Sequence, residues 1–443
     1  MTSRFEKRIR EAKIPPLVER YFSETACADQ MPLSTLAAFQ KEALQEVVAR
    51  AYEKSPFYNS KMTQAGISPQ DIKSTADLAK FPFTTKEELR QNPWVLLACD
   101  KKDISVINVS TGTTGGKEIY AMHTWSDYYV NHLIVYPRLI PVASGDLCFV
   151  MLPYEMSSAG LSMHHKFVNG YQVGVMPAGK GGAYSAPEKA VRLMRELKPT
   201  VVVTSPSYAI TLAEAAAESS FDLTGLRLKK IILGGEGCSP SFRKRVEKIW
   251  GTTANFSYGS MECGGIGSEC DAHNGYHISE GHFLLEIVDP KTGKVLMPGE
   301  IGEVVITCLL RFDTPLIRYR TQDYGFIDET PCSCGVSLRR LFLRGRSVDQ
   351  IVLKGKPFSP FYLEDFLMRL PEVGNWYQFV IKPGNNDLLK IVTEPGAGVI
   401  PTPELSVDLS GKLEAAIGVP CELQFVEQIP RSLKKAVRVV INS

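Results

Sequence analysis

The sequence predicts an α/β protein with a large N-terminal domain, built on mostly parallel sheets and an antiparallel ribbon, and a small α+β C-terminal domain. Short apolar, β-branched runs alternate with helical patterns at residues 147–152, 200–204 and 231–233. Buried strands that alternate with helices are typical of a parallel sheet. After residue 274 the pattern changes, because runs at 283–288 and 302–307 flank a turn that contains Pro290 and Gly293. This second pattern predicts the antiparallel ribbon.

The N-terminal segment and the domain boundary complete this organisation. Residues 3–58 have apolar positions at helical spacing, interrupted at Pro15 and Pro16. Thr84, with Glu87 three residues later, predicts the capping box of a further helix. We place a hinge near residue 346, so that the domains are 1–345 and 346–443.

Composition and charge exclude several classes of protein. The chain has 443 residues, 44% of them hydrophobic and 22% charged, with a formal net charge of +2. This balance gives no electrostatic basis for a nucleic-acid or anionic-membrane partner. The charged N-terminus resembles no signal peptide, and no apolar run is long enough to span a bilayer. The ten cysteines are scattered, which favours free thiols or metal ligands. We therefore expect a cytoplasmic enzyme, monomeric or homodimeric.

A glycine-rich segment is the most informative motif. Its residues are Ser110, Thr111, Gly112, Thr113, Thr114 and Gly115, followed by Gly116 and Lys117. Small hydroxyl residues and glycines let backbone N–H groups surround a polyphosphate. The segment is not a Walker loop, because Gly112 and Gly116 are one residue too close and Glu118 replaces the magnesium-binding hydroxyl residue. The alternative interpretation is a flexible surface loop.

Three other segments point to the same ligand class. Gly235 and Glu236 follow a predicted strand and precede a helix, where open α/β sheets bind ligands. Residues 255–262 end a similar run with Tyr258 and Glu262. Asp323 is a carboxylate close to two arginines in sequence and is suited to a ribose diol. Each alone is equally well a turn or a structural ion pair, but their order along the chain favours a nucleotide site.

With these motifs, the chain resembles the phenylacetate–coenzyme A ligase branch of the adenylate-forming superfamily. The similarity runs from about residue 55 to 440 and is carried by segments 55–58, 78–85, 110–115, 206–208 and 315–323. It implies the adenylate-forming enzyme fold with a mobile C-terminal domain. It also implies a two-step reaction, in which a carboxylate attacks the α-phosphate of ATP and coenzyme A then displaces AMP from the acyl-adenylate.

The resemblance assigns roles to individual residues. The 110–115 loop would bind the leaving phosphates, and Glu262 would hold Mg²⁺. Gly235 and Glu236 would face adenine, and Asp323 would bind the ribose hydroxyls, with Arg346 close by at the hinge. The remaining nucleotide contacts would come from Ser257, Tyr258 and Gly259, and Tyr258 would also border the acyl group.

The catalytic lysine of the family lies near the C-terminus. Residues 430–439 match the family string Pro-Arg-Ser-x-Gly-Lys-Ala-x-Arg-Val, and this match assigns the catalytic role to Lys435. A flexible ammonium can reach the charge that develops between the carboxylate and the α-phosphate. Lys434 replaces the family glycine and is the alternative assignment, and a solvated basic tail is the interpretation without function.

Four residues are candidate zinc ligands. Cys270, His277, Cys332 and Cys334 would supply a closed tetrahedral set, although His273 and His282 are rival ligands and unrelated free thiols are the alternative. Some relatives carry Glu-Cys, a His seven residues later, and a Cys-x-Cys-Gly. The resemblance therefore implies a structural Zn²⁺, because four protein ligands leave no open coordination position.

Three positions depart from the family pattern. Met261 precedes Glu262 where Ser or Thr is usual, and Lys117 replaces the proline that usually follows the loop. Val348 replaces the first of two acids that often serve as the hinge. The last change concerns the domain rotation that links the two half-reactions.

The family preference and the aromatic segment 125–136 favour a small aromatic carboxylic acid as substrate. Tyr154, Ser158 and Ala159 occupy the positions where relatives place part of the acyl pocket, and His164 and His165 follow closely. We expect at least half of the aromatic rings to be core.

Two other functions fit the sequence. One is an adenylating enzyme of a biosynthetic pathway that passes the acyl group to a carrier protein or an amine. The other is a non-catalytic nucleotide-binding regulator on the same fold, because a fold does not fix a function.

Overall fold

The computed structural model describes residues 13–23, 26–110, 117–346, 349–384, 386–432 and 435–442. The chain forms two compact units, Met1–Pro177 with Asn255–Leu343 and Ala178–Ala254 with Arg344–Ser443. The second unit thus combines a central segment with the C-terminal segment, which the sequence did not predict. The division into domains 1–345 and 346–443 stays a prediction.

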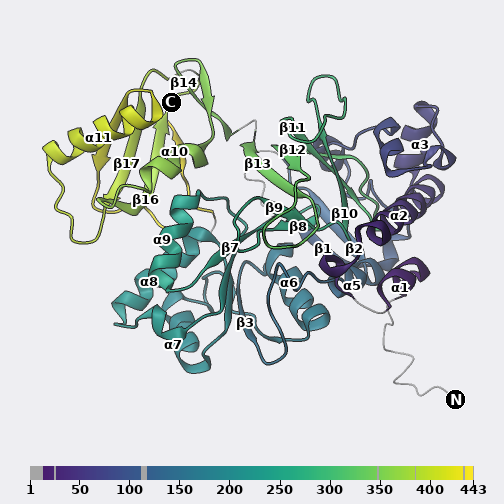
Figure 1. The fold of residues 1–443 in the computed structure, drawn as a ribbon, viewed down its shortest axis with the longest axis horizontal. Helices are drawn as coiled ribbons and strands as arrows, with labels where there is room; N and C mark the ends of the chain where they lie inside the picture. Colours follow the sequence, from purple (N-terminus) through teal and green to yellow (C-terminus); the bar gives the residue numbers. More distant parts are fainter. Residues whose placement is uncertain are drawn as a thin grey trace. The chain divides into compact units, whose positions relative to one another are not determined.

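The first unit contains six α-helices in its described part: α1 (Pro16–Phe22), α2 (Leu33–Lys54), α3 (Pro56–Gln64), α4 (Lys86–Gln91), α5 (Trp125–Leu133) and α6 (Ser158–His165). Helix α2 buries Phe39, Ala43, Val47 and Ala51, which recur every fourth residue and form one apolar face. Helices α2 and α3 lie side by side (Figure 1). No helix in the described ranges is long and apolar enough to cross a bilayer.

The predicted capping box of α4 was wrong by one residue. Thr85, not Thr84, is the N-cap, and its side chain accepts a hydrogen bond from the N–H of Glu88. Thr84 is fully buried, and its hydroxyl donates to the carbonyl of Ile317 at 2.7 Å. The two adjacent threonines therefore have different roles, because Thr84 joins two segments of the chain and Thr85 caps the helix.

Seven strands of the first unit are hydrogen-bonded neighbours in the order β10-β11-β12-β13-β9-β8-β7. Their bounds are β7 (Ala254–Ser260), β8 (Gly264–Ser268), β9 (Tyr276–Ile278), β10 (Phe283–Val288), β11 (Gly302–Cys308), β12 (Tyr319–Asp328) and β13 (Arg340–Arg346). The predicted ribbon is confirmed, because β10 and β11 pair antiparallel from Phe283↔Cys308 to Val288↔Glu303. Antiparallel pairing also joins β11 to β12, β7 to β8, β8 to β9 and β9 to β13, and so extends beyond the predicted ribbon.

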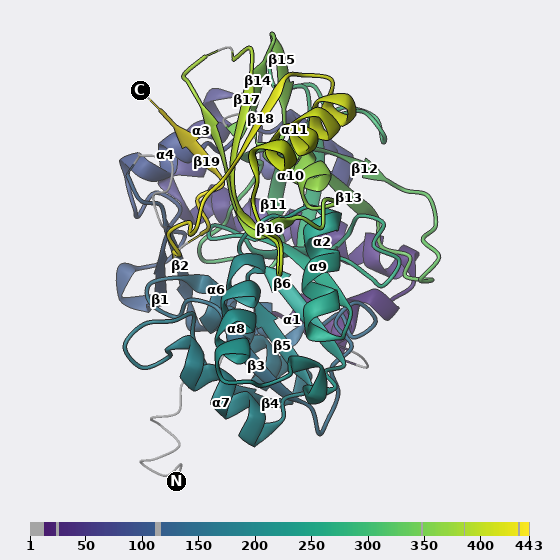
Figure 2. The same cartoon turned by 90° about the vertical axis from the view of Figure 1, so that its left-hand side faces the viewer.

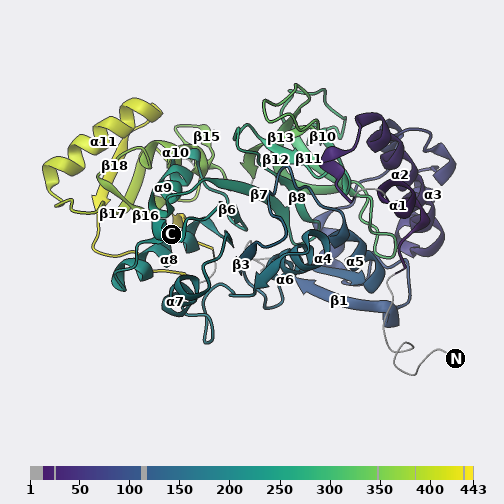
Figure 3. The ribbon, with the colours of Figure 1, turned by 60° about the horizontal axis from the view of Figure 1, so that its bottom comes forward.

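The first unit has two further strand pairs. Strands β1 (Ile104–Val109) and β2 (Tyr120–Thr124) form an antiparallel hairpin, and β3 (Leu147–Met151) pairs in parallel with β4 (Gly174–Met176). Figure 3 shows α5 against the hairpin.

In the second unit, strands β5 (Val201–Thr204) and β6 (Lys230–Gly234) pair in parallel, as the β-branched runs predicted. They alternate with α7 (Pro187–Leu197), α8 (Pro206–Glu218) and α9 (Pro240–Trp250). Both strands are buried along their whole length. Such burial on both faces explains their nearly continuous apolar sequence.

The C-terminal part of the second unit has a sheet in the order β18-β17-β16-β19. Its strands are β16 (Val373–Ile381), β17 (Leu389–Pro395), β18 (Cys421–Phe425) and β19 (Val439–Ile441). Helices α10 (Pro360–Leu367) and α11 (Pro403–Ile417) lie beside this sheet in Figures 1 and 2. A short hairpin, β14 (Ile351–Leu353) and β15 (Lys356–Phe358), precedes them. This sheet with its helices confirms the predicted combination of helices and strands in the C-terminal segment.

Helices α9 and α10 join the two segments of the second unit. The N-terminus of α9 receives two carboxylates from α10, since the N–H groups of Ser239 and Ser241 donate to Glu364 and Asp365. Burial raises the pKa of Glu364, which also accepts a hydrogen bond from the hydroxyl of Tyr377. Further along α9, the guanidinium of Arg245 donates to four backbone carbonyls, those of Met368, Leu370, Val373 and Gly374.

Candidate active site

The glycine-rich loop is held at its base by the β1–β2 hairpin. Val109 pairs with Tyr120, and the N–H of Ser110 donates to the carbonyl of Ile119 at 2.9 Å. The N–H of Ile119 in turn donates to the hydroxyl of Ser110 at 2.8 Å. Five of the predicted phosphate-binding residues lie outside the described residues: Thr111, Gly112, Thr113, Thr114 and Gly115. Their role stays a prediction, and Ser110 marks where the loop begins.

The predicted acyl-pocket residues lie next to this hairpin. The N–H of Val109 donates to the carbonyl of Met156 at 2.7 Å, which joins β1 to the segment after β3. Ser158 and Ala159 open helix α6, whose N-cap Ser157 accepts from the N–H of Ala159 at 3.3 Å. The ring of Tyr154 lies over Gly160, where an added Cβ would be 2.7 Å from Cδ2 of the tyrosine. Gly160 therefore allows the ring to rest on the start of α6.

Histidines surround this segment, and sequence reasoning identified only some of them. His164 is 3.5 Å from the hydroxyl of Tyr154. The ring of His165 contacts Tyr128 and His132, with centroids 5.4 Å and 5.8 Å apart. His132 also lies 3.1 Å from the hydroxyl of Ser162 through Nε2. Because His132 comes from α5 and His165 from α6, only packing of the two helices reveals the group.

Two predicted carboxylates are each fixed by a tyrosine from the other's segment. Tyr258 on β7 donates to Oδ2 of Asp323 on β12 at 2.6 Å. Tyr319, at the start of β12, donates to Oε1 of Glu262, just after β7, at 2.9 Å. The spacing of four residues is the same on both segments, so the two pairs are reciprocal. Sequence reasoning missed Tyr319, although its strand alternation with Asp323 places both side chains on one face.

The two arginines next to Asp323 in the sequence pair with carboxylates elsewhere in the sheet, and the role of Asp323 stays a prediction. Arg318 forms a two-bond ion pair with Glu286, at 2.9 Å for each bond, and Arg320 pairs with Glu303. Successive strand residues point to opposite faces, and Arg320 therefore leaves the face that carries Asp323. The arginines stabilise the sheet, and the tyrosine–carboxylate pairs form the polar face.

The turn that carries Glu262 has further support. Arg311, which is buried, donates to the backbone carbonyl of Glu262 at 2.6 Å. Ser257 and Gly259 lie on β7 opposite β8, and a Cβ on Gly259 would be 2.5 Å from the carbonyl of Gly264. Glycine at 259 is thus required by the close approach of two strands, which is a structural reason independent of any nucleotide.

The predicted adenine segment belongs to the second unit. Gly235 follows β6 with a φ of 78°, which a residue with a Cβ rarely adopts. The carboxylate of Glu236 pairs with Lys180 at 2.8 Å and accepts from the hydroxyl of Ser207 at 2.8 Å. Both charged side chains are buried, at 5% and 9% exposure, so the pair holds the turn in place. Sequence reasoning missed Lys180, which no motif distinguishes.

The remaining predicted residues lie in the C-terminal part of this unit. Arg346 is the last residue of β13, and its carbonyl accepts a hydrogen bond from the side chain of Gln350 at 3.0 Å. Lys435 is exposed. Lys434, the alternative lysine, and Val348, the hinge departure, lie outside the described residues.

The four predicted metal ligands come together in the first unit. The ligand atoms of Cys270, His277, Cys332 and Cys334 all lie within 4.8 Å of one another. Sγ of Cys270 is 3.7 Å from Sγ of Cys332, and Sγ of Cys334 is 3.3 Å from Nε2 of His277. These separations fit a tetrahedral Zn²⁺, for which two thiolates at about 2.3 Å from the metal lie about 3.8 Å apart.

The orientation of His277 also fits a metal. Its Nδ1 is 3.0 Å from the carbonyl of Leu338. A carbonyl only accepts, so Nδ1 carries the proton and Nε2 presents its lone pair to the cysteines. The rival ligands have other neighbours, since His273 lies 3.6 Å from Glu269, and His282 bonds to the hydroxyl of Tyr136 at 2.7 Å.

The fold and these features define an adenylate-forming enzyme. The sequence pattern of the AMP-binding enzyme family matches residues 27–308, and that of the AMP-binding enzyme C-terminal domain matches residues 355–442. The chain therefore belongs to the AMP-binding enzyme family.

Relatives place it within the phenylacetate–coenzyme A ligase branch. The chain is 32% identical to the phenylacetate-coenzyme A ligase of Thermus thermophilus over 366 residues, covering 80% of each chain. It is 32% identical to the enzyme of the same name from Aromatoleum evansii, covering 91% of this chain and 94% of the relative. Among solved structures, a 2-hydroxyisobutyryl-CoA ligase in the postadenylation state matches with a TM-score of 0.86 at 22% identity, covering 98% of this chain and 95% of that one.

Proposed function

We propose that this protein is an AMP-forming ligase that activates a small aromatic carboxylic acid with ATP and transfers the acyl group to coenzyme A. The geometric observation that carries the proposal is the reciprocal pairing of Glu262 and Asp323 with Tyr319 and Tyr258. It fixes two carboxylates of the kinds that an adenylating enzyme uses, one for a cation and one for a ribose diol.

In the first step, a carboxylate oxygen of the acid attacks the α-phosphorus of ATP and pyrophosphate leaves. Lys435 stabilises the negative charge that develops between the two anions. Asp323 accepts hydrogen bonds from the ribose hydroxyls while Tyr258 keeps it oriented. Tyr319 takes one acceptor position of Glu262, and a carboxylate has several, so Glu262 fits a Mg²⁺ ligand, and that ion would neutralise phosphate charge.

In the second step, the thiol of coenzyme A attacks the acyl carbonyl, and AMP leaves with the carboxylate oxygen. Several curated relatives are named phenylacetate-coenzyme A ligases, which supports an aromatic acid and this acceptor. Tyr154, with Ser158 and Ala159 beside it, offers an aromatic wall with small polar neighbours. His164 near the tyrosine hydroxyl suits a ring with a polar substituent.

The proposal includes a structural Zn²⁺ at Cys270, His277, Cys332 and Cys334. Four protein ligands complete a tetrahedral shell and leave no position for substrate. We also propose a cytoplasmic location, because the ten cysteines form no disulfide among the described residues and thiols stay reduced there. The division into 1–345 and a mobile 346–443 domain belongs to the same proposal.

Acid-dependent exchange of pyrophosphate into ATP tests the first step. We expect exchange with a subset of benzoates, phenylacetates and cinnamates, and a loss of at least about 100-fold in Lys435→Ala, because the lysine acts on the transition state. Lys412→Ala, at an exposed position on α11, is the matched control. Undiminished exchange in Lys435→Ala would exclude this lysine, and binding of ATP without exchange for any acid would favour the regulator.

The acceptor is tested with the acid that gives the fastest exchange. We expect a thioester with coenzyme A, detected by mass spectrometry. Transfer only to a carrier protein bearing phosphopantetheine, or only to an amine, would instead assign the protein to a biosynthetic pathway.

A further inference from the structure

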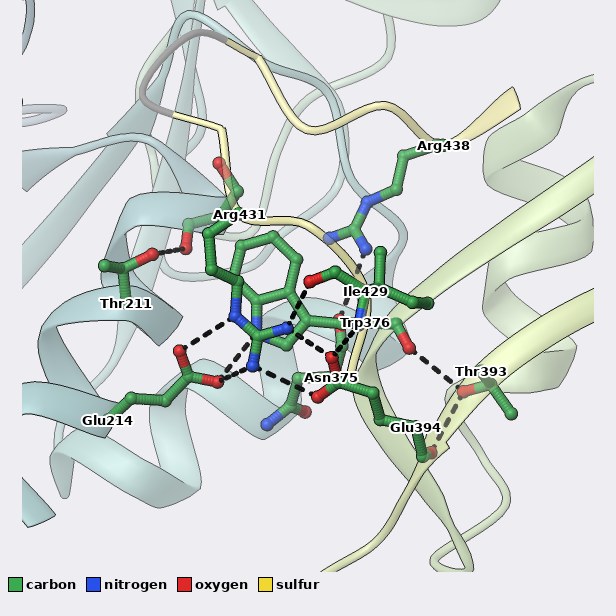
Figure 4. A network of polar contacts seen from close by, with 10 residues as sticks. Thr211, Glu214, Asn375, Trp376, Thr393, Glu394, Ile429, Arg431 and Arg438 are labelled. Atoms are coloured by element: carbon green, nitrogen blue, oxygen red, sulfur yellow. Dashed lines mark hydrogen bonds and ion pairs between the residues drawn. The ribbon is translucent and has the colours of Figure 1, made fainter. Parts of the chain in front are cut away.

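Arg431 is the centre of a polar cluster in the second unit (Figure 4). Its guanidinium pairs with Glu394 and with Glu214, the latter at 2.7 Å, and lies 4.3 Å from the ring of Trp376. The indole N–H of Trp376 also donates to Glu214 at 2.8 Å. Glu214 therefore accepts hydrogen bonds from two residues of the C-terminal segment at once.

The partners of Arg431 come from two separate parts of the sequence. Trp376 lies on β16 and Glu394 on β17, in the same sheet of the C-terminal segment. Glu214 lies on α8, more than 200 residues before Arg431. The bond to Glu394 thus belongs to the C-terminal sheet itself, whereas the bond to Glu214 fixes the segment of Arg431 to a helix outside that sheet.

Arg431 is close in sequence to the proposed catalytic lysine. Lys435 follows Arg431 by four residues and precedes Arg438 by three. Arg438 is anchored at the other end, since its carbonyl accepts from the N–H of Phe379 at 2.8 Å and its guanidinium lies 4.3 Å from the ring of Tyr377. Lys435 therefore lies, in the sequence, between two arginines that both have fixed partners.

The stretch of chain between Arg431 and Lys435 is short. Four residues reach at most about 14 Å, so the position of Arg431 limits where Lys435 can lie. A misplacement of about 1 Å can cost roughly 100-fold in rate when a charged group must meet a transition state. The partners themselves are partly exposed, with side-chain exposures of 27% for Arg431 and 38% for Glu214. An exposed ion pair contributes little to stability, so a role in positioning accounts better for this cluster.

We infer that Glu214 is a positioning residue for the adenylation step. By bonding to Arg431 and Trp376, it holds Arg431, four residues before Lys435, against α8. This inference deepens the proposed function and rests on it, because it requires that Lys435 acts in adenylation. Lys435 acts where charge develops at the α-phosphate, so a residue that works through it affects the first half-reaction and leaves the second unchanged.

The test measures the two half-reactions separately in Glu214→Gln. Pyrophosphate exchange reports adenylation, and release of AMP from a synthetic acyl-adenylate on addition of coenzyme A reports thioester formation. We expect exchange to fall about 10- to 100-fold and thioester formation to stay within about twofold of wild type. Glu214→Asp, which keeps the charge, should recover part of the exchange.

Two variants make the test decisive. Glu218→Gln removes the same charge from an exposed position one turn later on α8 and should leave both half-reactions unchanged. Lys435→Ala should lose exchange. If Lys435→Ala loses exchange while Glu214→Gln keeps the wild-type rate, the inference fails and the proposed function stands. Equal losses in both half-reactions of Glu214→Gln would show a merely structural role, and undiminished exchange in Lys435→Ala would overturn the lysine assignment together with this inference.

Discussion

Single hydroxyl groups define the polar face of the first unit. Tyr258 and Tyr319 each donate one hydrogen bond to a carboxylate, and each bond joins β7 or the turn after it to β12. A carboxylate held by a buried or half-buried donor keeps one orientation, which is what a ligand for a cation or a ribose needs. The residues that orient the carboxylates therefore matter as much as the carboxylates.

Asp127, in the first turn of α5, lies in an environment that disfavours its charged form. Its side chain is 3% exposed, and it accepts a hydrogen bond from the N–H of Asp313 at 2.8 Å. Burial, and next the charge of Asp313, raise the pKa of Asp127 from 3.8 to about 7. Between these values the native state holds a proton that the unfolded state has lost. The free energy of unfolding therefore falls as pH rises through this window, and the loss is complete above about pH 7.

This sign leads to a prediction for Asp127→Asn. The amide does not titrate and keeps an acceptor for the N–H of Asp313. The free energy of unfolding of the variant, relative to wild type, should therefore rise by roughly 1–3 kcal/mol from pH 5 to pH 8. Urea unfolding followed by circular dichroism at both pH values measures this change. Asp100→Asn, at a side chain that is 70% exposed, is the control and should show the same difference from wild type at both pH values. A constant difference for Asp127→Asn would contradict the raised pKa.

At the scale of elements, the cysteine–histidine cluster joins the short strand β9 to the loop between β12 and β13. Strand β9 has three residues, and His277 on it pairs with Arg340 on β13. Cys332 and Cys334 lie in the loop between β12 and β13. A metal held by all four ligands would fix this loop to β9, so its removal should loosen the loop more than the strands around it.

We therefore predict that Cys332→Ser loses zinc and stability but keeps the chemistry. Wild-type protein should contain about one zinc per chain, and the variant almost none, with a thermal midpoint lower by roughly 5–10 °C. Elemental analysis and thermal unfolding measure the two effects, and pyrophosphate exchange below the melting range should be nearly normal. Cys99→Ser, outside the cluster, is the matched control. Full zinc occupancy in Cys332→Ser would rule out the site.

The whole molecule consists of two units, and the second is assembled from distant parts of the chain. Ser239, just before α9, and Arg245 on α9 form hydrogen bonds with the segment 364–374. The central segment therefore packs against residues that follow Arg344 in the sequence. The division at residue 346 that the sequence predicts stays a prediction.

A truncated chain of residues 1–345 distinguishes the two descriptions. We expect it to fold, because strands β5 and β6 with their helices have buried cores of their own. Its free energy of unfolding should be lower than that of the full chain by roughly 1–3 kcal/mol, since Arg245 loses its carbonyl partners. It should also lose pyrophosphate exchange, because it lacks Lys435. Urea unfolding and exchange assays measure both effects, and a chain that fails to fold would make the second unit, rather than the predicted domain, the unit of folding.

Short-range patterns predicted most of the elements. The β-branched runs became β5 and β6, and the ribbon at 283–308 formed as expected, because side-chain periodicity and turn chemistry act over a few residues. The capping box predicted at Thr84 lies one residue later, because the hydroxyl of Thr84 is buried and donates to the carbonyl of Ile317. Lys180 and Tyr319 were missed, because their partners lie 56 and 57 residues away and no local pattern marks them.

The sequence by itself determined the class of this protein, the α/β fold and the candidate residues of its site, because motifs such as 110–115 and 318–323 are contiguous. Only the tertiary structure decided which of them share a face. It separated Arg318 and Arg320 from Asp323, chose His277 over His273 and His282, and brought Glu214 to Arg431. The physical reason is that strand alternation, burial and pairing between distant segments select partners that adjacency in the chain does not reveal.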